Sequence, residues 1–131
     1  MSAEVEEIIT RGTVLRLEPD GIVRYRTKPG SEFTLTEAKE DIEAIRKLGK
    51  GKRLPILVDL RGARSVDREA RSYFSGAEAA NVELAAALLI GSPLSRLIGN
   101  FFLSVSPPRI PIKLFVSEAD AIAWLKTLMK G

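Results

Sequence analysis

Alternating apolar and polar residues in the N-terminal part of the chain predict a β-hairpin. Thr13–Glu18 and Ile22–Thr27 both alternate, which is typical of strands with one face on a core. Pro19–Gly21 between them contains residues that favour tight turns. Residues 1–11 begin with several acids, and we expect them to form an N-terminal arm outside the domain.

After the hairpin, the spacing of apolar residues changes to three and four, which predicts an amphipathic helix. Its apolar stripe consists of Leu35, Ala38, Ile42, Ile45 and Leu48. Thr34 and Glu37 have the spacing of a capping box, and Gly49 fits the end of the helix. The charged residues on the other face, Glu37 among them, are expected to be solvated.

Three short, nearly unbroken apolar runs predict central strands that are covered on both faces. They are Pro55–Leu60, Leu84–Ile90 and Ile112–Val116. Helical patterns separate and follow these runs. They cover residues 67–81 with a break at Ser75-Gly76, residues 93–105 after the N-cap Ser92, and the C-terminal residues after the capping box Ser117–Asp120.

The predicted order is therefore β-β-α-β-α-β-α-β-α. Strands that alternate with helices favour parallel βαβ units with right-handed crossovers. Because the first two strands form a hairpin, the five-stranded sheet should be mixed. The sequence thus predicts an α/β fold with one layered domain over residues 12–131.

Composition excludes several kinds of chemistry. The chain of 131 residues has no cysteine and no histidine, which removes thiolate chemistry, disulfides, histidine acid–base catalysis and common zinc sites. We expect no metal and no cofactor. The net charge is only +3, and basic residues alternate with acids, so nucleic-acid binding is not expected. No apolar run is long enough to span a membrane, and the start does not resemble a signal peptide. We expect a cytoplasmic protein.

The segment Leu54–Arg71 is the predicted working surface, because ligands of α/β proteins often bind where a strand leads into a helix. Its charged and hydroxyl residues are Asp59, Arg61, Arg64, Ser65, Asp67, Arg68 and Arg71. If the helix begins early, Arg64, Arg68 and Arg71 share one face and could bind phosphates or carboxylates. Alternatively the arginines form a solvated face, Asp59 accepts loop amides and Asp67 caps the helix.

Val58–Asp67, with this element order, resembles the STAS fold, and within it the SpoIIAA-like group. Ser92–Phe102 and Ala121–Leu125 also resemble SpoIIAA-like bacterial sequences of unknown role. Within the STAS fold the chain resembles this group more than the true anti-anti-sigma factors, in which a serine at the helix start is phosphorylated. Arg68 stands at that position here, and Ser65 is a nearby but displaced hydroxyl.

We therefore expect a non-catalytic module that binds another protein through residues 59–71. The alternative is a carrier of a lipid or small amphipathic molecule, because SpoIIAA-like domains resemble lipid-binding CRAL-TRIO domains in shape. Leu97, Phe101 and Phe102 would then line an apolar pocket or an interface, and the adjacent phenylalanines should point in different directions. A hydrolase using Ser65 or Asp59 is the least favoured function. An open sheet edge or helix face would also allow a homodimer.

Overall fold

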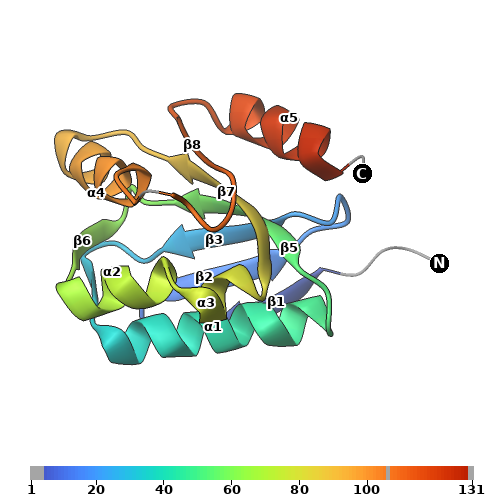
Figure 1. The fold of residues 1–131 in the computed structure, drawn as a ribbon, viewed down its shortest axis with the longest axis horizontal. Helices are drawn as coiled ribbons and strands as arrows, with labels where there is room; N and C mark the ends of the chain where they lie inside the picture. The colour runs from blue at the N-terminus through green and yellow to red at the C-terminus, as the bar shows by residue number, and fades with distance from the viewer. Residues whose placement is uncertain (1–4, 106, 130–131) are drawn as a thin grey trace.

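The computed structural model describes residues 5–105 and 107–129 (Figure 1). The strands are β1 (Glu6–Ile9), β2 (Thr13–Leu17), β3 (Val23–Thr27), β4 (Ser31–Phe33), β5 (Leu54–Asp59), β6 (Ala63–Val66), β7 (Glu83–Leu89) and β8 (Ile112–Phe115). The helices are α1 (Leu35–Gly49), α2 (Arg68–Phe74), α3 (Ala77–Ala80), α4 (Pro93–Leu103) and α5 (Glu118–Met129). No helix in this part of the chain is long and apolar enough to cross a membrane.

The main sheet is mixed and has the strand order β1-β2-β3-β5-β7-β8. β1 and β3 each pair antiparallel with β2, whereas β3, β5, β7 and β8 are parallel. A second, two-stranded sheet pairs β4 with β6. The parallel half requires crossovers, and the helices provide them on the two faces of the sheet.

Helices cover the two faces of the sheet unequally (Figure 1). Ala85, Ala87 and Leu89 of β7 pack with α5 on one face. Ala86 and Leu88 point to the opposite face, where α1, α2, α3 and α4 contribute to two further apolar clusters. This alternation follows from the two-residue period of a strand. It explains why β5 and β7 are apolar at nearly every position.

The layered α/β architecture predicted from the sequence is confirmed, with more strands than the five expected. Glu6–Ile9, within the expected N-terminal arm, pairs with β2 as an edge strand. β4 and β6 are short strands that lie in predicted loops. Strands this short show little alternation in the sequence. Each pairs with a single neighbouring strand and is only partly buried, so the choice of its residues is weakly constrained.

The predicted helix boundaries follow local hydrogen bonds. The Thr34 backbone N–H donates to the Glu37 carboxylate at 2.8 Å, and the Ser95 N–H donates to the Ser92 hydroxyl at 3.1 Å. The helical region 67–81 breaks into α2 and α3 at Ser75-Gly76, as expected. The prediction that Glu37 is solvated was wrong. Its side chain folds back onto Thr34 and is only 8% exposed.

Candidate functional site

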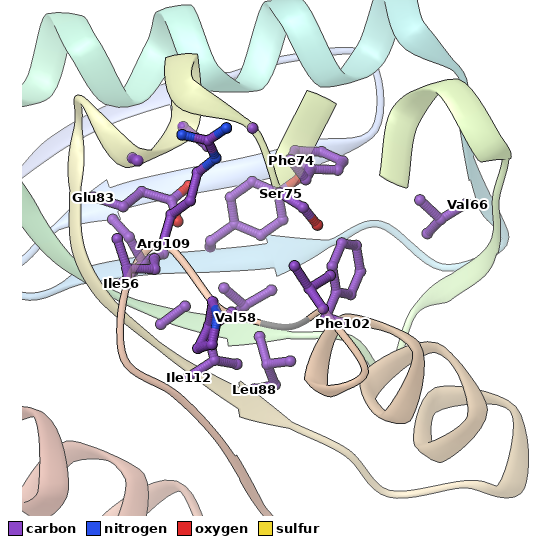
Figure 2. Close-up of a pocket in the computed structure, with 18 of the residues that line it drawn as sticks. Ile56, Val58, Val66, Phe74, Ser75, Glu83, Leu88, Phe102, Arg109 and Ile112 are labelled. Carbon is purple, nitrogen blue, oxygen red and sulfur yellow. The ribbon is translucent and has the colours of Figure 1, made fainter. Parts of the chain in front are cut away.

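A partly enclosed, mainly apolar cavity lies between the main sheet and helices α2, α3 and α4 (Figure 2). Side chains from β3, β5, β7 and β8 line one wall, and residues 108–110 contribute to another. Its volume is about 80 Å³. About 10–15 Å³ of such space is enough for one water molecule. The cavity is therefore large enough for a small organic molecule.

Aromatic contacts hold the helical walls of this cavity together. The ring of Phe74, at the end of α2, makes edge-to-face contacts with Tyr25 at 6.5 Å, Phe33 at 6.3 Å and Phe102 at 6.3 Å between centroids. Such pairs stabilise beyond their buried area. Phe74 thereby joins the sheet, the β4 segment and α4 around the cavity.

Glu83, the first residue of β7, brings a carboxyl group into this apolar space. Its side chain is at one end of the cavity, and Val66 and Phe102 lie toward the other end (Figure 2). The residue is 9% exposed. Its carboxyl makes no hydrogen bond or ion pair with any residue that the structure describes. Burial raises its pKa to about 8, because ionisation in an apolar site is unfavourable.

A second buried acid, Asp41 of α1, contrasts with Glu83 because it accepts three hydrogen bonds. The hydroxyls of Thr10 and Thr13 donate to it at 2.6 and 2.7 Å, and the Tyr25 hydroxyl donates as well. Burial raises the pKa of Asp41 despite these donors. Burial, followed by the charge of Asp41, raises the pKa of Tyr25 well above its usual value. Tyr25 lines the cavity, but its hydroxyl donates its hydrogen bond to Asp41 and not to Glu83.

Asp59 of the predicted surface is held by neighbouring arginines. Arg61 donates to both carboxylate oxygens, from Nε at 2.9 Å and from Nη2 at 2.8 Å, and its backbone N–H donates at 3.0 Å. Arg26 lies 3.5 Å away. Burial raises the pKa of Asp59, but the Arg61 hydrogen bonds and the two positive charges outweigh it and leave the pKa lowered. Asp59 accepts a loop amide, as the structural interpretation of this residue predicted.

The remaining residues of the predicted surface do not share one face. α2 begins only at Arg68, so Arg64 and Ser65 lie on β6. The three- and four-residue spacing of Arg64, Arg68 and Arg71 therefore does not place them on one face. Side chains repeat every two residues along a strand and every 3.6 residues along a helix. Arg64 lies 3.5 Å from Glu32, and both side chains are largely exposed.

Asp67 and Arg71 have structural contacts at the start of α2 and beside α4. Asp67 is the N-cap and accepts a hydrogen bond from the Ala70 N–H at 2.9 Å, as the capping interpretation predicted. The Arg71 guanidinium lies 3.6 Å from the centroid of the Phe101 ring, a cation–π geometry. Arg68 and Arg71 also line a shallow depression that shares Ser75 and Val105 with the cavity.

The two adjacent phenylalanines of α4 point in different directions, as their spacing on a helix predicts. Phe102 lines the cavity (Figure 2). Phe101 is 41% exposed and Leu97 is 67% exposed. Of the three residues predicted to form an apolar pocket or interface, the structure thus places only Phe102 at the cavity.

Comparisons with known proteins agree with this fold. The family model for a domain of unknown function, DUF7793, matches residues 15–129. The chain belongs to the DUF7793 family. The curated proteins contain no match to it.

Two solved structures resemble this DUF7793 domain. An uncharacterised protein of the DUF3478 family from Shewanella loihica PV-4, described as having a SpoIIAA-like fold, is 12% identical with a TM-score of 0.58. The match covers 95% of this chain and 98% of that one. A protein of unknown function from Arthrobacter sp. FB24 is 34% identical, with 86% and 97% coverage and a TM-score of 0.34. The first similarity shows the SpoIIAA-like fold.

Glu83 of the DUF7793 domain was missed in the sequence, although a weak indication of it was present. It immediately precedes the apolar run Leu84–Ile90, where an acid usually belongs to the solvated loop. The strand begins one residue earlier and includes it. Asp41 stands beside the apolar stripe of α1. Both acids stand next to apolar runs, and that position was the available signal for their burial.

Proposed function

We propose that the domain is a non-catalytic binding module whose cavity takes a small, mainly apolar molecule. The observation that carries the proposal is the apolar cavity between the sheet and α2–α4, with a single buried carboxyl inside it. Concave apolar sites with few polar groups are typical of ligand pockets. This proposal corresponds to the small-ligand carrier, which was the alternative to the protein-interaction module in the sequence analysis.

The cavity also offers little for catalysis among the residues that line it. Its lining hydroxyls and carboxyl come from Tyr25, Thr27, Ser75 and Glu83. Tyr25 donates to Asp41, and Thr27 donates to the Asp59 carbonyl at 2.8 Å. An activated nucleophile needs a base within hydrogen-bond reach, and Ser75 makes no side-chain hydrogen bond with the described residues. These contacts support binding over a reaction.

Backbone amide NMR with n-butanol as the apolar probe would test the cavity. We expect the amide shifts of cavity-lining residues to change on titration. Ala86→Val and Ala80→Leu narrow the cavity from β7 and α3 and should abolish these shifts. Ala77→Leu adds volume at an exposed position of α3, so the amide shift changes should be the same as in the wild type. Equal shifts in the wild type and both narrowed variants would contradict binding in the cavity.

A regulatory protein-interaction role is the second candidate function. It is supported by the exposed apolar residues Leu97 and Phe101 of α4 and by Arg71, which stacks on Phe101. Arg64 and Arg68 are exposed on the neighbouring β6 and α2. This function would place the domain in the cytoplasm with a protein partner or as a homodimer. Partner capture with wild-type and Arg64→Glu/Arg68→Glu proteins, together with light scattering, tests it. Identical partner profiles would count against this surface.

A further inference from the structure

The carboxyl of Glu83 is buried without any partner that would stabilise its charge. The other buried acids in the described chain have donors: Glu37 has Thr34, Asp41 has three hydroxyls, and Asp59 has Arg61. A buried carboxyl with no donor or cation is costly when ionised and unsatisfied when neutral. In the free domain, the Glu83 carboxyl at one end of the cavity therefore lacks a hydrogen-bond donor or a cation.

We propose, on the basis of the proposed function, that the cavity takes a small apolar amine whose ammonium group binds the Glu83 carboxylate. An ammonium supplies both the charge and the N–H donors that this carboxyl lacks. The rest of the ligand would extend along the apolar walls toward Phe102 and Val66, which lie away from Glu83 (Figure 2). The ligand class is therefore a short hydrocarbon with one cationic end.

Two other titratable or charged residues, Tyr25 and Arg109, line the cavity, and neither is paired with Glu83. Glu83 is therefore the group that would select the ligand. Tyr25 faces it from β3 and keeps its proton, because its pKa is raised by burial and by Asp41 behind it on α1. Arg109, which precedes β8, also lines the cavity. Its side chain is exposed, and it forms no ion pair with Glu83 in the structure. Water screens an exposed charge far more than a buried one.

Binding of the ammonium form requires the loss of one proton. In the free domain Glu83 has a pKa of about 8 and is mostly neutral at pH 7. The amine is protonated in solution, as lysine is with its pKa of about 10.4. When the ammonium binds, the Glu83 carboxyl releases its proton to solvent and becomes the counter-ion. The affinity should therefore rise as pH increases toward 8 and level off above it.

A comparison of n-butylamine with n-butanol tests the proposal, because the probes share a hydrocarbon and differ in the head group. NMR titration at pH 7 should show n-butylamine binding about tenfold or more tightly than n-butanol, as expected for a hydrogen bond between charged groups. Glu83→Gln keeps the shape of the neutral carboxyl, so it should fold. In this variant the preference should disappear. Calorimetry in buffers of different ionisation enthalpy should detect release of about one proton by the wild type.

Glu69→Gln is the matched control, because it removes the same charge from an exposed position of α2. It should retain the amine preference and its pH dependence. Equal affinities of the two probes for the wild-type cavity would overturn the amine proposal and leave the proposed function standing. An amine preference that persists in Glu83→Gln would also overturn it. Failure of both probes to bind in the cavity would overturn the two proposals together.

Discussion

At the scale of single residues, the two buried acids Asp41 and Glu83 have opposite surroundings. Asp41 joins three elements of the fold, because its donors come from the β1–β2 turn, β2 and β3. The Glu83 carboxyl makes no hydrogen bond or ion pair with the described residues, and it is directed into an apolar cavity. Buried polar groups in proteins are nearly always paired. The satisfied acid therefore has a structural role, whereas the unsatisfied one marks a binding site in our proposal.

Replacement of Asp41 should destabilise the domain strongly. Asp41→Ala leaves the buried hydroxyls of Thr13 and Tyr25 without an acceptor, which should lower the free energy of unfolding by roughly 2–4 kcal/mol. Urea denaturation at pH 7 measures the change. Glu43→Ala, at an exposed position of the same helix, should change the stability by less than about 0.5 kcal/mol. Similar losses in both variants would show that the hydrogen-bond network contributes little.

At the scale of secondary-structure elements, caps determine where the helices near the cavity begin. Asp67 accepts from the Ala70 N–H and so fixes the first turn of α2. α2 ends at Phe74, whose ring forms part of the cavity wall. The start of a seven-residue helix thus controls the position of an aromatic side chain two turns later.

Loss of the α2 cap should have a moderate effect. Asp67→Ala removes the side-chain acceptor and should lower the free energy of unfolding by about 1 kcal/mol. Asp67→Ser restores an acceptor without the charge and should recover most of that loss. Chemical denaturation of the three proteins gives the comparison. If the serine variant is as unstable as the alanine variant, Asp67 stabilises the domain through its charge and not through the capping hydrogen bond.

At the scale of the whole molecule, the sheet separates two environments. α5 packs densely on one face through Ala121 and Leu125, which are both fully buried. On the other face, several helices and the segment before β8 meet around the cavity and do not fill it. Interiors normally pack without voids larger than a water. This cavity lies on the face that holds Glu83.

The stability of the whole domain should depend on the ionisation of Glu83. Its pKa is raised to about 8 by burial, so the native state keeps a proton that the unfolded chain loses above about pH 4.3. The free energy of unfolding should therefore fall as pH rises from about 5 to 8, by an amount on the order of a few kcal/mol, and the fall should end above pH 8.

Glu83→Gln supplies the reference for this pH dependence, since it lacks the titrating group and keeps the others. The difference in unfolding free energy between the variant and the wild type should grow between pH 5 and 8. The pKa of Asp59 is lowered, so its contribution to stability is lost only at more acidic pH. That contribution is equal in the two proteins and cancels in the comparison. Parallel stability curves for the two proteins over this range would show that Glu83 is not buried as an unpaired acid.

The order of the main strands and helices could be predicted from the sequence, because periodicity, caps and turn residues act within a few neighbouring positions. Thr34, Asp67 and Ser92 are examples, since each accepts or donates within three residues. The residues of the candidate site could not be predicted in this way, because they come together only in the folded domain. Glu83, Val66 and Phe102 meet because distant elements pack across the sheet, and Arg64 leaves the surface shared with Arg68 because β6 pairs with β4. Such contacts depend on which faces come together in space, and the local pattern of residues does not specify that.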